Sequence, residues 1–172
     1  MNSNKKNSHL YVKNKPKYQQ IETILQFLGW FDGRVANIED FKHLALLHNC
    51  GWTKAIDMFC NSYADLDECI YLGFDENTVA KFDFVMRFTP DEAAMWYKDP
   101  VFGRITKYSG EPVLCLGSFG YYYEGVIAIG ESGKLYVAHD YNDEVKSYDS
   151  LNDAIEGEFL PNTVISVISN HT

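Results

Sequence analysis

The spacing of hydrophobic residues changes partway along this chain of 172 residues, and this change limits the possible folds most strongly. Up to about residue 66, apolar side chains recur every three or four positions, a period typical of amphipathic helices. From residue 69 onward they alternate or form short runs, as they do in β-strands. Helices that come first and strands that mostly follow predict an α+β fold. We expect an antiparallel β-sheet with the N-terminal helices packed on one face.

Three helices are predicted before the change of period. Segment 18–28 places its apolar residues on one helical face and is followed by a glycine that can end the helix. Segments 37–51 and 53–66 begin at Asn37 and Thr53, whose side chains can accept a backbone N–H at a helix N-terminus. These segments supply the helical layer expected over the sheet.

Two shorter helices are predicted among the strands. Thr89 and Glu92 form a capping box at the start of one, and Ser150 can cap the other, over 150–159. Residues 131–133 are expected to make a tight turn that joins two strands as a hairpin. The strand-like runs are 69–74, 81–88, 112–119, 122–130, 134–140 and 163–169.

Charge is distributed unevenly along the chain. Five lysines precede the first acidic residue and the formal net charge is −9, so residues 18–172 carry −14. Residues 1–16 are expected to be a flexible basic arm and residues 17–172 a single domain. An acidic domain repels phosphate groups, so no nucleic-acid partner is expected, whereas a partner with a basic surface would be attracted.

No export or membrane signal is recognised in the sequence. There is no run of about 18 apolar residues, and the first residues lack the apolar stretch of a secretory signal. We therefore expect a cytoplasmic protein without a membrane partner. The four cysteines fit no zinc-binding spacing, so free thiols and no metal or other cofactor are expected.

The stretch GSFGYYYEGVIAIG, residues 117–130, is similar to the loop that covers the ATP phosphates in protein kinases. That loop needs three glycines and, after it, a lysine that holds the phosphates. Here Cys115 stands at the first glycine position and Gly130 at the lysine position, and no catalytic-loop or magnesium-binding motif follows. The glycines are therefore interpreted as places where strands bulge or turn.

A cysteine nucleophile with a histidine base is the other enzymatic candidate. Cys115 and His139 fall on different predicted strands, and such a pair needs an exposed thiolate beside the base. Cys115 lies between two leucines in an apolar run, which favours a structural cysteine. No catalytic residue and no metal-ligand set is predicted, and the protein is not expected to be an enzyme.

Tyrosines and carboxylates near the strand ends are the candidates for binding a partner protein. Exposed aromatic residues beside charged ones are typical of interfaces. The predicted contact residues are Tyr122, Asp140, Tyr141, Asp143 and Glu144. Two other acidic clusters, at residues 65–68 and 75–76, are open alternatives.

Three stretches, 28–66, 113–119 and 126–159, read together as a family signature. They contain a GW-x-x-GR turn between helices, a glycine–aromatic step, a Leu-Gly strand, a β-hairpin and a closing helix. The positions that match are Gly29, Trp30, Gly33, Arg34, Gly51, Trp52, Phe59, Tyr63, Ala64, Leu66, Ile129, Gly133, Tyr136, Ser150 and Ala154. In this order and spacing they resemble the third subfamily of the SUKH superfamily of immunity proteins. Cys115 stands where proline is usual in that family.

The resemblance implies a bacterial antitoxin that binds a toxin domain, often a nuclease, and neutralises it by contact. It also implies an α+β fold, in agreement with the hydrophobic periods. The toxin-contacting positions of the family vary, so no binding residue is carried over from it. A non-catalytic adaptor or scaffold of the same fold is the first alternative, and a small enzyme of unknown type is the second.

Overall fold

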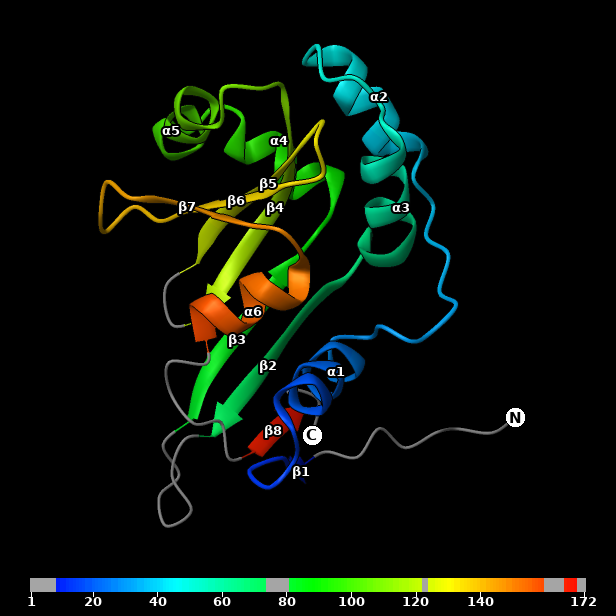
Figure 1. Cartoon of the computed structure of the whole chain (residues 1–172), viewed down its shortest axis with the longest axis vertical. Coiled ribbons are helices and arrows are strands. Elements are labelled where there is room, and N and C mark those ends of the chain that lie inside the picture. Colours follow the sequence, from blue (N-terminus) through cyan, green and yellow to red (C-terminus); the bar gives the residue numbers. More distant parts are fainter. Residues whose placement is uncertain (1–8, 74–80, 122–123, 160–165, 170–172) are drawn as a thin grey trace.

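The computed structural model describes residues 9–73, 81–121, 124–159 and 166–169, arranged as Figure 1 shows. The helices in this part of the chain are α1 (Lys17–Phe27), α2 (Glu39–Leu47), α3 (Lys54–Tyr63), α4 (Pro90–Trp96), α5 (Pro100–Ser109) and α6 (Leu151–Phe159). The strands are β1 (His9–Tyr11), β2 (Asp67–Gly73), β3 (Lys81–Arg87), β4 (Val113–Tyr121), β5 (Gly125–Gly130), β6 (Leu135–Ala138), β7 (Val145–Tyr148) and β8 (Ser166–Ser169). All helices in these ranges fall short of what is needed to cross a lipid bilayer.

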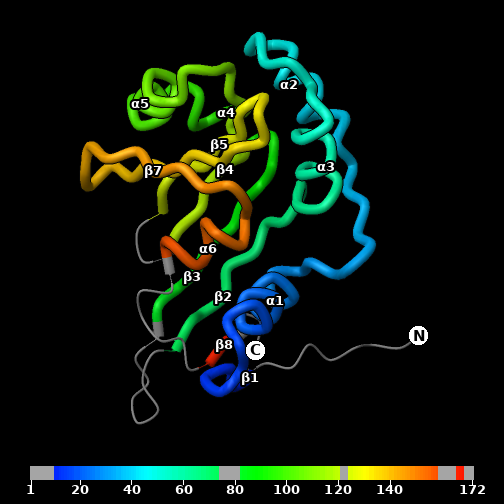
Figure 2. Tube along the Cα trace, in the orientation of Figure 1, coloured from blue at the N-terminus to red at the C-terminus, as the bar shows by residue number. Residues whose placement is uncertain are grey.

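The strands form one sheet in the order β1-β8-β2-β3-β4-β5-β6-β7. Every neighbouring pair in this order is antiparallel. From β2 to β7 each strand pairs with the next along the chain, whereas β8 returns beside β2 and carries β1 at the edge. Figure 2 shows this return, with β8, β1 and α1 lying together. The predicted α+β class with an antiparallel sheet is confirmed.

The N-terminal helices pack as their hydrophobic period predicts. In α1 the buried apolar residues are Ile21, Ile24 and Leu25. Gly29 follows with φ 101°, a conformation in which any other side chain would be strained. Helix α3 begins at Thr53, whose hydroxyl accepts the N–H of Ile56. Lys17 of α1 pairs with Glu156 of α6 at 3.1 Å, which places these two helices side by side.

Helices cover both faces of the central strands. Every residue of β5 and β6 is buried. Tyr136 meets Tyr108 of α5, whereas His139, three positions further on, meets Glu158 of α6. Because successive residues of a strand point to opposite faces, α5 and α6 lie on opposite sides of the sheet. The sequence did not predict α5, nor did it predict β7.

Two predicted boundaries are wrong. Residues 9–11 do not belong to a flexible arm, because they pair with β8 as strand β1, and Val12 behind them is fully buried. Residues 1–8 lie outside the described part of the chain. Helix α2 ends before Gly51, since Asn49 already has φ 55° and turns the chain out of the helix.

Candidate functional site

The turn between β6 and β7 brings the predicted partner-binding residues together. Asp140, Tyr141, Asp143 and Glu144 are all exposed there, and 60% of the Tyr141 surface is open to solvent. Tyr122 lies outside the described residues. The prediction that these carboxylates share one surface is consistent with the fold, but their binding role stays a prediction.

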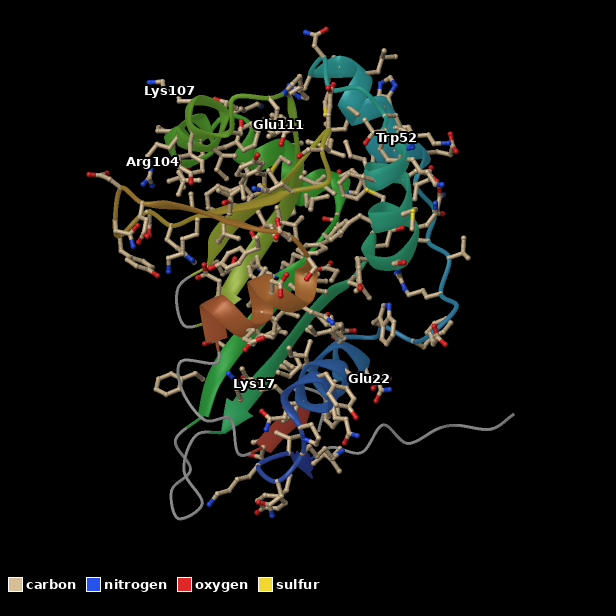
Figure 3. All side chains as sticks on the ribbon, in the orientation of Figure 1. Lys17, Glu22, Trp52, Arg104, Lys107 and Glu111 are labelled. Atoms are coloured by element: carbon tan, nitrogen blue, oxygen red, sulfur yellow. The ribbon has the colours of Figure 1, made fainter. Side chains whose placement is uncertain are left out.

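Arg104 of α5 holds the backbone of this turn (Figure 3). Its guanidinium donates hydrogen bonds to the carbonyl oxygens of His139 and Asn142. The Asn142 side chain in turn accepts the N–H of Glu144 at 3.0 Å, a local turn that asparagine favours. Arg104 also lies 3.9 Å from a carboxylate oxygen of Asp143, but that carboxylate is fully exposed and the pair is weak. The turn is therefore fixed through its backbone, which leaves the acidic side chains outward.

A buried polar cluster supports the turn from below. His139 is 6% exposed, and its Nε2 lies 3.2 Å from a carboxylate oxygen of Glu158 on α6. The Tyr148 hydroxyl donates a hydrogen bond to the other carboxylate oxygen of Glu158 at 2.6 Å. The Lys146 ammonium lies 3.9 Å from that same oxygen. The Tyr141 ring stacks on the His139 ring with 4.9 Å between centroids. The cluster thereby links α6, β7 and the turn.

The surroundings of the cluster lower the pKa of Glu158 and raise that of Tyr148. Burial acts to raise the pKa of Glu158, but the hydrogen bonds from His139 and Tyr148 and the charge of Lys146 outweigh it, so the pKa lies below its ordinary value. Burial raises the pKa of Tyr148, and its hydrogen bond to the Glu158 carboxylate raises it further. Glu158 is therefore held ionised as the acceptor at the centre of the cluster.

The proposed cysteine–histidine pair is not assembled. Cys115 lies opposite Ala128, and Ala128 lies opposite Tyr136, so all three point to the α5 face. His139 points to the α6 face. Cys115 is fully buried, and burial raises the pKa of its thiol. The four cysteines are free thiols, as predicted.

Helix α6 extends the acidic surface beyond the turn. Asp149 precedes the helix and Asp153 lies in its first turn, and both are exposed. Asp149 lies before Ser150, whose side chain caps the helix, whereas Asp153 and Glu156 are three apart within the helix and share one helical face. We call the exposed carboxylates of the turn and of the start of α6 the acidic band: Asp140, Asp143, Glu144, Asp149 and Asp153.

Of the two alternative acidic clusters, the structure describes only the one at residues 65–68. In the cluster at 65–68, Asp67 lies 3.6 Å from the Arg87 guanidinium, which partly neutralises it. Asp75 and Glu76 lie outside the described residues.

Gly51, a position of the signature, and Thr53 hold the helices against the sheet. The N–H of Gly51 donates to a carboxylate oxygen of Glu131 at 2.7 Å, and the Thr53 hydroxyl donates to the Glu131 carbonyl at 2.9 Å. This seats the predicted β5–β6 turn between α2 and α3. The Arg34 guanidinium donates to the carbonyl of Ser62 near the end of α3 at 3.1 Å.

Among the described residues, no group of three or more His, Cys, Asp or Glu side chains is placed to hold a metal ion. Comparison of the chain with known protein families, curated proteins and solved structures gives no match.

Proposed function

We propose that this chain is an immunity protein, a cytoplasmic antitoxin that binds a cognate bacterial toxin domain and neutralises it by direct contact. The sequence signature of the SUKH superfamily is the reason for naming a toxin as the partner. The observation that carries the proposal is the acidic band, five exposed carboxylates on the β6–β7 turn and at the start of α6.

The acidic band suits the basic cleft of a toxin that degrades nucleic acid. The domain beyond the N-terminal lysines carries −14, so a basic partner is attracted before contact. Arg104 and the Glu158 cluster hold the band in a fixed geometry, which lowers the entropy lost when a partner binds. Charge of this kind chiefly raises the association rate.

Tyr141 supplies an aromatic contact beside the carboxylates. Its ring is 60% exposed and stacks on the buried His139, so it reaches the partner from a supported position. Tyrosine buries a large area at low entropic cost and is enriched among the residues that dominate binding energy.

The proposal predicts association kinetics that depend steeply on salt. The probe is the toxin domain that the proposal expects to be encoded beside the gene of this protein. The association rate constant kon should fall sharply above about 0.1 M salt, where the Debye length is ~10 Å. Replacing Asp140, Asp143 and Glu144 together by alanine should lower kon several-fold at low salt and flatten the salt dependence. Stopped-flow fluorescence measures both quantities.

A matched control removes three carboxylates elsewhere on the surface. Asp65, Asp67 and Glu68 replaced together by alanine change the net charge equally but lie outside the acidic band. This control should retain more of the wild-type kon. A kon that ignores salt, or that falls equally in both triple variants, would remove the acidic band from the mechanism.

A further inference from the structure

Two adjoining hollows lie beside the acidic band, at the start of α6. The first, of about 360 Å³, is bounded by α3, by the β5–β6 hairpin and by the residues that begin α6. The second, of about 200 Å³, is bounded by α1 and by Trp30. Tyr63 and Asn152 line both hollows, so together they form one depression, the α1–α3–α6 groove.

The wall of the groove is a row of aromatic rings. The ring of Trp30 lies 6.5 Å from that of Tyr63, which lies 4.9 Å from that of Phe59. All three rings are only partly buried and pack against the core beneath. Partly buried aromatic rings fixed by packing are the side chains that most often anchor protein interfaces.

Flexible apolar side chains stand exposed on the groove. Met58 of α3 lines the first hollow and is 62% exposed, and Tyr18 of α1 lines the second and is 64% exposed. Beneath them the groove reaches Leu135 and Leu151, which are buried core residues. An apolar side chain of a partner protein placed in the groove would contact both the buried leucines and the exposed Met58. The flexible Met58 side chain can adjust its conformation to such a partner.

The charged residues of the groove are acidic. Glu22 lines the second hollow and projects from α1, as Figure 3 shows, while Asp149 lines the first. Among the described residues neither carboxylate has an ion-pair partner within 4.0 Å. Asp149 also belongs to the acidic band, so the groove and the band share this carboxylate.

We propose that the α1–α3–α6 groove is the socket for an apolar side chain of the toxin, carried on a segment whose flanking residues are lysine or arginine. The apolar chain fills the hollow against Met58 and Tyr63, and the flanking cations meet Glu22 and Asp149. This inference rests on the proposed function and additionally identifies the surface that anchors the partner. Helix α6 is about 13 Å long, so one toxin surface can reach the groove and the β6–β7 turn together.

The test compares two methionines of similar exposure on different surfaces. Met58→Arg places a cation in the groove, whereas Met95→Arg places one on α4, where Met95 is 67% exposed. Both variants change the net charge equally. With the toxin domain encoded beside the gene as the probe, Met58→Arg should weaken binding at least roughly tenfold, mostly through a faster koff. Met95→Arg should stay within about twofold of wild type.

The outcomes separate the groove from the proposed function. Both variants should keep the wild-type melting temperature within a few degrees, because both methionines are exposed. If the wild type binds the toxin domain and Met58→Arg binds equally well, the groove is not the socket, while the proposed function stands. Weaker binding by Met95→Arg than by Met58→Arg overturns the groove in favour of α4. If the wild type itself does not bind, the proposed function is wrong, and the groove assignment falls with it.

Discussion

Replacing Glu158 by alanine is expected to lower the free energy of unfolding by about 3–5 kcal/mol, because two hydrogen bonds to a charged acceptor are lost, each typically worth about 1.5–3 kcal/mol. The Glu158 side chain is 6% exposed and accepts from His139, which is buried, and from Tyr148, which is partly buried. Without the carboxylate, both donors lose their acceptor in a place where water does not replace it. The β6–β7 turn loses its support at the same time.

Glu156→Ala is the matched control, two residues earlier in the same helix. Glu156 is 47% exposed and pairs only with Lys17 among the described residues. Its removal should cost no more than about 1 kcal/mol. Urea denaturation of the three proteins measures the difference. A Glu158→Ala variant as stable as Glu156→Ala would contradict the role given to the buried cluster.

The destabilisation by Glu158→Ala should depend on pH. The fold holds the pKa of Glu158 below its ordinary value, so the ionised form is the one that folding favours. Its contribution is complete above the unfolded pKa, near 4.3 for an ordinary glutamate, and is lost as the pH falls through the lower folded value. The titratable and charged groups that face it are His139, Tyr148 and Lys146. The stability gap between wild type and Glu158→Ala should therefore be wide at pH 7 and narrow in acid below about pH 4.

Replacing Gly117 by alanine is expected to destabilise the fold by at least about 3 kcal/mol, from steric overlap and backbone strain combined. Gly117 has φ 137° and lies at the irregular register between β4 and β5. A β-carbon there would overlap the carbonyl oxygen of Arg87 on the neighbouring strand β3. The glycine that looks like part of a phosphate-binding loop thus serves close strand packing.

Gly103→Ala is the matched control, and this glycine-to-alanine substitution is expected to stabilise the fold rather than destabilise it. Gly103 lies within α5, and a β-carbon there meets no atom within 4 Å. Alanine should stabilise this helix by up to about 1 kcal/mol, because it favours the helical conformation more than glycine does. Thermal unfolding of both variants is the measurement. A Gly117→Ala protein that melts with the wild type would show that β3 and β4 do not approach so closely.

The elements with an unambiguous hydrophobic period were predicted well from the sequence. The apolar face of α1, the cap of α3 at Thr53 and the turn between β5 and β6 all appear where expected. In α4 the Thr89 hydroxyl accepts the Glu92 N–H, which is one half of the predicted capping box, whereas the Glu92 carboxylate accepts the Ser118 hydroxyl. In these segments local propensity and tertiary packing favour the same conformation, which is why single-sequence reasoning succeeds.

Two of the three missed elements, β1 and β7, are short strands defined by their pairing, whereas the third, α5, has local signals at both ends. Both ends of helix α5 have local sequence signals: Asp99 caps its N-terminus, and Gly110 ends it in the left-handed conformation. Strand β7 has only four residues and is defined by its pairing with β6. The pairing of β1 with β8 joins the two ends of the described chain and has no local signal.

The candidate site could be predicted only in part. The carboxylates of the β6–β7 turn stand close together in the sequence, so their shared surface was foreseeable. Their supports come from elsewhere: Arg104 from α5 and Glu158 from α6. The groove joins Trp30, Tyr63 and Asn152 through the packing of three helices. Such contacts follow from the tertiary fold and cannot be read from a local pattern.

Co-expression with the toxin domain encoded directly beside its gene is the most direct test of the central claim. We expect cells that produce both proteins to survive, the two chains to co-purify as a stable complex, and the purified protein to inhibit the toxin without consuming any substrate. Undiminished toxicity in cells that contain the folded protein, with no complex between the two chains, would contradict the claim that this protein acts as an antitoxin.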